Sequence, residues 1–208
     1  IASCLVGSEM CIRDRFNSKA FTPENFGYTV SFDKKGNSFA AELIGDKVTC
    51  DNITFSIADH ENKNVIKCKG DTIQLPKEAA GKKLYILAAS TDKDRKSTFL
   101  VNGKSHEFEI PYYSGFYGQW GHKGVSDGYI RNASLAYIGS HRHTEKGNDT
   151  YIYTYMYKLG IELPQEAHTL VLPKDENIAV FAITLSDNYI DDISTANEMR
   201  TLPLEVSK

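Results

Sequence analysis

The sequence predicts an all-β protein, folded as an antiparallel β-sandwich or jelly roll. Short apolar and β-branched runs recur about every 8–12 residues between Gly, Asn, Asp and Pro, which is typical of strands and turns. The chain holds 12 Tyr and 10 Phe against one Trp, and aromatic side chains are enriched on half-buried strand surfaces. Helical periodicity is not sustained, and Ser194–Arg200 is the only candidate for a short helix.

The expected strands follow one another without a linker long enough to separate two domains. In chain order they cover residues 28–32, 39–43, 47–50, 53–57, 65–68, 72–75, 83–88, 96–101, 106–110, 135–143, 150–163, 169–172 and 178–184. Asn102 and Gly103 connect two of them, and this dipeptide favours a type I′ hairpin because both positions tolerate a positive φ. We therefore expect one sandwich domain over residues 16–186, followed by a polar tail or linker over 187–208.

The sharpest local pattern is an antiparallel hairpin between residues 135–143 and 150–157. Tyr151, Tyr153, Tyr155 and Tyr157 alternate with other residues, so the two-residue period of a strand places all four on one face. We expect this face to be packed, since four exposed tyrosine rings would leave a large apolar area in water.

Length and charge narrow the class of protein. A chain of 208 residues corresponds to one large domain or two small ones. It carries 24 Lys and Arg against 27 Asp and Glu, a net charge of −3, whereas binding to nucleic acid needs a basic face. No run reaches the roughly 18 uncharged apolar residues of a membrane span. We therefore expect no nucleic-acid partner and no membrane span.

Cys50 and Cys68 lie in two of the expected strands. The sequence has no CxxC or Cys/His spacing of the kind that holds structural zinc. The two thiols are expected to be free. The alternative is a disulfide between adjacent strands, which would imply an oxidising compartment.

Residues 1–15 match nothing that follows in pattern or composition. Back-translated, the run from Leu5 to Arg15 resembles a transposase-end oligonucleotide used to prepare sequencing libraries. We interpret residues 1–15 as a translated adapter that is not native, so the genuine N-terminal part should be missing and this segment should make no specific core contacts. The alternative is a lipoprotein cleavage box at Ile1–Cys4, but no basic and apolar segment precedes it.

Several short segments together carry a family resemblance. They are Phe32–Asp33, Gly36–Glu42, Cys68–Gly70, Ile73–Pro76, Leu84–Ser90, Gly115–Trp120, Ser140–His143, the tyrosine series, Ile161–Pro164, Leu170–Pro173 and Val180–Thr184. Through them, residues 28–185 resemble the C-terminal β-rich part of bacterial α-mannosidases of glycoside hydrolase family 38, particularly the Bacteroidetes type. The resemblance implies a non-catalytic accessory sandwich of a glycan-degrading protein that is periplasmic, secreted or on the cell surface.

The catalytic chemistry of that family does not extend to this chain. Its enzymes use zinc, an Asp nucleophile and a His-Asn-Asp-Pro metal loop in an N-terminal catalytic domain, and none of the six histidines here begins such a loop. The resemblance therefore implies no catalytic residue and no cofactor within these residues, a zinc-dependent parent protein, and the catalytic domain of the same parent chain as partner. An autonomous carbohydrate-binding module and a cell-surface interaction domain are the alternatives.

An aromatic, Gly-rich segment is the candidate contact with mannose-containing glycan. Sugar rings stack on exposed aromatic faces, while their hydroxyls need amide or charged partners. The candidate residues are Tyr112, Tyr113, Tyr117, Gln119, Trp120 and His122. The alternative is that Trp120 closes one end of the sandwich as part of the core.

Three residues are secondary candidates for binding a metal. His141 and His143 share a strand face, where imidazoles two residues apart can chelate a metal, but no sequence feature names a third ligand. Hydrogen bonds to Tyr hydroxyls or loop backbone are the favoured interpretation of these histidines, with Arg142 in an ion pair on the opposite face. Asp33, with Lys34–Asn37 and Glu42, is the other candidate, for Ca²⁺, against a simple solvated turn.

Overall fold

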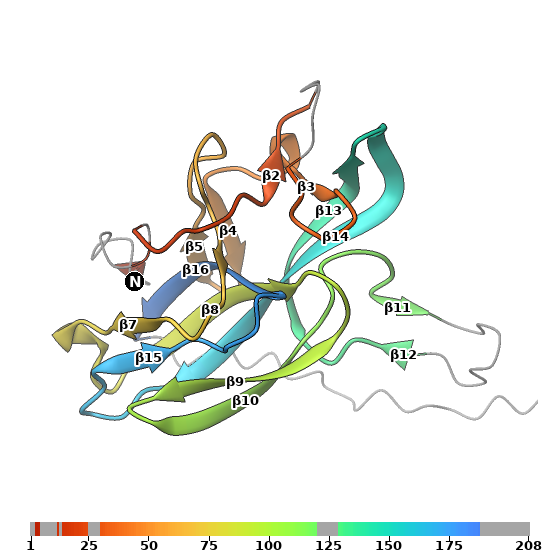
Figure 1. The fold of residues 1–208 in the computed structure, drawn as a ribbon. Coiled ribbons are helices and arrows are strands. Elements are labelled where there is room, and N and C mark those ends of the chain that lie inside the picture. The colour runs from red at the N-terminus through yellow and green to blue at the C-terminus, as the bar shows by residue number, and fades with distance from the viewer. Residues whose placement is uncertain (1–2, 5–11, 13, 25–29, 120–128, 188–208) are drawn as a thin grey trace, which may run out of the picture.

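The computed structural model describes residues 3–4, 12, 14–24, 30–119 and 129–187. Its main sheet has eight strands, all antiparallel to their neighbours except for one parallel pair, β2 and β3 (Figure 1). The order across this sheet is β1 (Ser3–Cys4), β16 (Ile178–Ser186), β8 (Lys83–Ser90), β14 (Gly147–Glu162), β13 (Ser134–Thr144), β3 (Ser38–Ala40) and β2 (Phe21–Thr22), with β6 (Ile66–Lys67) also pairing with β16.

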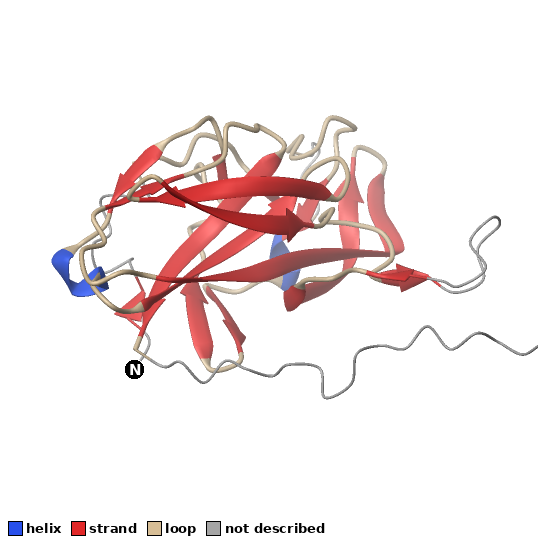
Figure 2. Cartoon of the chain, turned by 90° about the horizontal axis from the view of Figure 1, so that it is seen from below, coloured by secondary structure: helices blue, strands red, loops and turns tan. Residues whose placement is uncertain are grey.

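A second, antiparallel sheet packs against the main one. Its order is β10 (Lys104–Ile110), β9 (Arg95–Val101), β15 (Thr169–Val171) and β7 (Thr72–Gln74). Two further strand pairs are formed by β4 (Lys47–Cys50) with β5 (Ile53–Ser56) and by β11 (Gly118–Gln119) with β12 (Tyr129–Ile130). The 3₁₀ turns are η2 (Ala41–Leu43) and η3 (Lys77–Ala79). Strands dominate the described chain (Figure 2). The predicted all-β sandwich is confirmed.

The centre of the main sheet is buried on both faces, which explains two long apolar runs in the sequence. Every residue of β16 is buried, as are all residues of β8 except Lys83. One core lies between the two sheets and includes Leu84, Phe99 and Leu170. A second, aromatic core covers the opposite face of the main sheet. Strands buried on both faces read as continuous apolar runs rather than as an alternation.

The aromatic core is built from residues far apart in the sequence. Its ring contacts include Phe32 with Tyr113, Phe39 with Tyr113, and Phe39 with Phe181, at centroid distances of 5.0, 5.1 and 5.4 Å. Phe21 and the β4–β5 hairpin complete it. Each fully buried Phe stabilises the fold by about 1.5–3 kcal/mol relative to an exposed one, so the core ties residues 32–33 and the β4–β5 hairpin to the main sheet.

The β13–β14 hairpin pairs as the sequence predicts, with Leu135 opposite Tyr157 and His143 opposite Asn148. The expectation that all four tyrosines share one packed face is wrong. Tyr155 and Tyr157 are buried, whereas Tyr151 is 79% exposed. Tyr151 has a φ of +64° and lies within a register shift between the pairs Gly139–Thr154 and His141–Thr150. This irregularity breaks the two-residue alternation.

Other local predictions have mixed outcomes. The Asn102–Gly103 turn is confirmed, with φ values of 48° and 82°. Val30–Phe32 is not a strand, and the expected strand at 39–43 ends at Ala40 and continues as the 3₁₀ turn η2. No disulfide joins Cys50 to Cys68 in the described part of the chain. The proposed helix at 194–200 and the tail beyond Asp187 lie outside the described residues.

The N-terminal segment differs from expectation where it is described. Ile12 is buried and belongs to the core between the sheets, together with Ile66 and Ile178. Ser3 and Cys4 pair with Leu185 and Thr184 of β16. The expectation that residues 1–15 make no core contacts is therefore wrong at Ile12, whereas Leu5 and Val6 lie outside the described residues.

In the described part of the chain, the structure has no helix of the length and apolar character needed to cross a membrane.

Candidate functional site

The predicted sugar-contacting segment divides into buried and groove-lining residues. Tyr113 is fully buried, and its hydroxyl donates a hydrogen bond to Asp33 Oδ2 at 2.9 Å. Burial, reinforced by the Asp33 charge, raises the pKa of Tyr113. Tyr113 is thus a core residue and is not available to stack on a sugar. Trp120 and His122 lie outside the described residues, and of Gln119 only the backbone, in β11, is described.

Tyr112 and Tyr117 lie nearer the surface. The Tyr112 carbonyl accepts hydrogen bonds from Arg131 Nη1 at 2.9 Å and from the Tyr157 hydroxyl at 3.1 Å, so its backbone is held against the main sheet. The Tyr117 hydroxyl donates to the Ala133 carbonyl at 2.9 Å. This bond fixes the half-buried Tyr117 ring at the wall of a groove.

The groove is open, with a volume of about 1050 Å³. It lies between β10, the start of β13 and the end of β14. Its lining residues are Asp51, Glu107, Phe108, Glu109, Tyr117, Ile130, Arg131, Asn132, Ala133, Ser134, Leu135, Lys158, Leu159 and Gly160. Aromatic, acidic and amide residues therefore border a single concavity. Glu107 and Glu109 project from the face of β10 opposite to Phe108, whose ring packs against Phe99.

The two cations in this lining are held by other groups. Lys158 Nζ lies 2.6 Å from Asp51 Oδ2 and 5.5 Å from the centre of the Tyr85 ring. Arg131 donates to the Tyr112 and Ser114 carbonyls and to the Tyr157 hydroxyl. Glu107, Glu109 and Asn132 are exposed. These side chains are the hydrogen-bonding groups that a ligand in the groove would meet.

A second constellation brings together three residues that sequence reasoning did not connect. Oε1 of Glu42, in η2, lies 3.0 Å from His141 Nε2 and 2.9 Å from His143 Nε2. The histidine partner is thus a carboxylate, and not the Tyr hydroxyl or loop backbone that the sequence favoured. Arg142 forms the expected ion pair, with its Nη2 2.7 Å from Asp149 Oδ2. A sequence signal for Glu42 is lacking, since it stands about a hundred residues from the histidines.

Asp33 is not placed as the sequence suggested for Ca²⁺. Its Oδ1 accepts hydrogen bonds from the backbone N–H groups of Lys35 and Asn37, and its Oδ2 from Asn37 Nδ2 and the Tyr113 hydroxyl. The carboxylate is buried and closes a turn, while Glu42 faces the histidines instead. Asp33 is therefore a structural residue, and its turn is not simply solvated.

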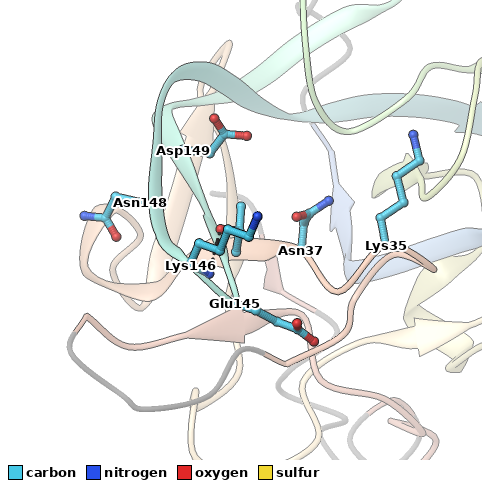
Figure 3. A pocket seen from close by; sticks show the side chains of 7 residues that line it. Lys35, Asn37, Glu145, Lys146, Asn148 and Asp149 are labelled. Carbon is cyan, nitrogen blue, oxygen red and sulfur yellow. Dashed lines mark hydrogen bonds between the residues drawn. The ribbon is translucent and has the colours of Figure 1, made fainter.

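The turn after Asp33 borders a small polar pocket at the tip of the β13–β14 hairpin (Figure 3). The pocket has a volume of about 440 Å³ and is lined by Lys35, Asn37, Thr144, Glu145, Lys146, Asn148 and Asp149. Lys35 comes from the turn after Asp33, whereas the acidic and basic side chains of Glu145, Lys146 and Asp149 come from the tip of the hairpin. None of its described lining residues is aromatic, so these residues suit a stacked sugar ring less well than those of the larger groove do.

The fold and the groove define a β-sandwich domain with a ligand-sized concavity on its surface. The model of the AziU2-like β-sandwich domain family matches residues 8–189, which is most of the chain. The protein belongs to this family. The match includes residues 8–15 of the segment interpreted as an adapter, and Ile12 of the same segment is packed in the core. The sequence has no significant match among curated proteins.

Proposed function

We propose that the protein is a non-catalytic accessory β-sandwich that contacts glycan through the large groove. The observation that carries this proposal is the joint lining of the groove by Tyr117, Phe108, Glu107, Glu109 and Asn132. Aromatic faces stack on the C–H faces of sugar rings, and carboxylates and amides accept or donate hydrogen bonds to sugar hydroxyls. The resemblance to the accessory region of family 38 α-mannosidases supports mannose-containing glycan as the ligand, and a periplasmic or cell-surface setting.

Titration of the ¹⁵N-labelled protein with α-linked mannose oligosaccharides tests this proposal. Amide shifts should concentrate at residues 107–109, 117 and 130–135. Replacing both Glu107 and Glu109 with Gln should weaken binding about tenfold or more, because hydrogen bonds to charged groups contribute about 1.5–3 kcal/mol. Glu78→Gln, an exposed change on η3 outside the groove, is the matched control. Equal binding by all variants would show that the groove is not the site.

A Trp120→Ala variant separates the two interpretations of that residue. If Trp120 stacks on sugar, the change should weaken binding by about 1–3 kcal/mol, by analogy with base stacking on aromatic side chains, and leave stability unchanged. If Trp120 is a core residue, the same change should instead cost about 3–5 kcal/mol of unfolding free energy. Denaturation and glycan titration of this one variant distinguish the outcomes.

A second candidate function is docking onto the catalytic part of a longer parent chain. It is favoured by two exposed apolar side chains near the groove, Phe116 at 56% and Ile130 at 46% exposure. Apolar side chains surrounded by polar ones are typical of protein-binding surfaces. Under this alternative, Ile130→Lys should destabilise the assembled parent protein and leave the unfolding of the isolated sandwich unchanged. The glycan titration would then give no shifts at the groove.

A further inference from the structure

Glu42, His141 and His143 form the only group of three or more potential metal ligands found within the described residues. Their candidate ligand atoms all lie within 4.8 Å of one another. The centroids of the two imidazole rings are 5.4 Å apart and the ring planes are inclined by 32°. Both Nε2 atoms contact the same carboxylate oxygen, Glu42 Oε1. We refer to these three residues as the His–Glu cluster.

The two Nε2–Oε1 separations in the His–Glu cluster are close to those between ligands of one ion. Ligands about 2.0–2.1 Å from a tetrahedral zinc ion lie roughly 3.3–3.4 Å from one another. The two N···O distances are 2.9 and 3.0 Å. A separation of a few tenths of an ångström would make room for the ion, which rotation of the partly exposed Glu42 side chain can supply.

We propose that Glu42, His141 and His143 bind a single divalent transition-metal ion, with zinc as the best match to their donor set. Two imidazoles and one carboxylate suit first-row metals such as zinc, nickel and iron better than they suit Ca²⁺ or Mg²⁺, which take oxygen ligands. Three protein ligands leave at least one position open for water or another small ligand. This inference does not depend on glycan binding.

The exposure of the three side chains indicates how an ion would reach the His–Glu cluster, and their hydrogen bonds indicate how the ligands are kept in place. The side chain of His143 is 5% exposed and that of His141 15%, whereas Glu42 is 28% exposed. The cluster is therefore open to solvent on the Glu42 side and closed behind His143. Without metal, the hydrogen bonds to Glu42 Oε1 keep the imidazoles turned toward a common point, which reduces the ordering that binding requires.

Metal binding requires a change of tautomer, which the structure accommodates at His141. In the hydrogen-bonded form each Nε2 carries a proton, whereas a metal needs the Nε2 lone pair. The proton must then lie on Nδ1, or leave. His141 Nδ1 is 3.3 Å from the Ser140 hydroxyl oxygen, which can accept it in a hydrogen bond, as the second nitrogen of metal-binding histidines usually does.

Two buried polar groups lie near Gly139, on the same hairpin as the two histidines. Tyr137 OH and Thr154 Oγ1 are buried and have no hydrogen-bond partner among the described residues. Both lie within 3 Å of the position that a Cβ on Gly139 would occupy, and Gly139 is two residues before His141 on β13. Burial and the Glu42 charge together raise the pKa of Tyr137. The Tyr137 hydroxyl therefore stays protonated at neutral pH and can act as a donor.

Calorimetric titration of the chelator-treated, full 208-residue chain with zinc chloride tests the proposal. We expect one ion per chain. Glu42→Gln and His141→Gln should each weaken binding at least about tenfold, since even outer-shell changes at metal sites cost 10–100-fold. His168→Gln, at an exposed position outside the cluster, is the matched control and should bind as the parent does. Circular dichroism checks that each variant is folded.

Substitution with Co²⁺ gives a readout of the ligands themselves. Visible d–d absorption should appear on addition of one equivalent to the wild-type chain and to His168→Gln, and be lost in Glu42→Gln and His141→Gln. Failure of the wild-type chain to bind one equivalent of zinc saturably would overturn the proposal. So would folded Glu42→Gln and His141→Gln variants that bind zinc as tightly as the wild type, because the ion would then lie elsewhere.

Discussion

Replacing Asp51 with Asn is expected to destabilise the protein by about 2–4 kcal/mol. Lys158 is 4% exposed, and its Nζ lies 2.6 Å from Asp51 Oδ2. At an effective dielectric constant of about 20 this attraction amounts to about 6 kcal/mol, most of which offsets the desolvation of the ammonium group. Removing one charge leaves the other buried, at a cost of about 3–5 kcal/mol. The cost is lower here because Asp51 is 24% exposed.

Asn is the suitable replacement because Asp51 has a φ of 50°, which Asn tolerates better than most residues. Urea denaturation followed by circular dichroism should be carried out on Asp51→Asn, Lys158→Met and the double variant. Lys158→Met should cost less than Asp51→Asn, since it leaves no buried charge, and the coupling energy of the cycle should be about 1.5–3 kcal/mol. A loss below about 0.5 kcal/mol for Asp51→Asn, with coupling near zero, would refute the reasoning, since surface pairs behave in this way.

Four other outcomes are expected. Ile12→Ala should cost at least about 2 kcal/mol of unfolding free energy, as buried Ile truncations do. Leu43→Ala, at 38% exposure, should cost much less. Equal and small losses in the two variants would instead support the interpretation of residues 1–15 as an adapter. Tyr113→Phe should cost about 1–3 kcal/mol by removing a donor from the buried Asp33 carboxylate, and an unchanged denaturation midpoint would contradict this. Burial raises the pKa of the Cys68 thiol. Maleimide at pH 8 should therefore label the half-buried Cys50 and spare Cys68 in the folded protein. Labelling of both thiols at equal rates would be inconsistent with the fold. The purified chain should not hydrolyse aryl α-mannosides, and turnover that follows the pure protein through purification would disprove a non-catalytic role.

The elements best predicted from sequence are those whose local signal is strong. Lys83–Ser90 and Ile178–Ser186 read as apolar runs because both of their faces are buried. Asn102–Gly103 specifies its turn through backbone conformation alone. Such signals depend on neighbouring residues only, so no knowledge of the tertiary structure is needed to interpret them.

The features that were missed depend on tertiary contacts. Tyr151 has a conformation with positive φ that its side chain does not favour, and the register shift around it cannot be read from an alternating pattern. Val30–Phe32 has the composition of a strand, yet Phe32 serves the aromatic core from a turn. Glu42 meets His141 and His143 only because η2 folds over β13. This contact cannot be predicted from charge or from residue spacing along the chain.

The position of β16 has a consequence for how the protein is made. It is the last of the described strands to be synthesised, yet it pairs with β8 on one side and with β1 and β6 on the other. Until residues 178–186 have left the ribosome, β8 keeps an open apolar edge of the kind that recruits other chains. The nascent protein therefore completes its central sheet only after nearly all of the described chain has been translated.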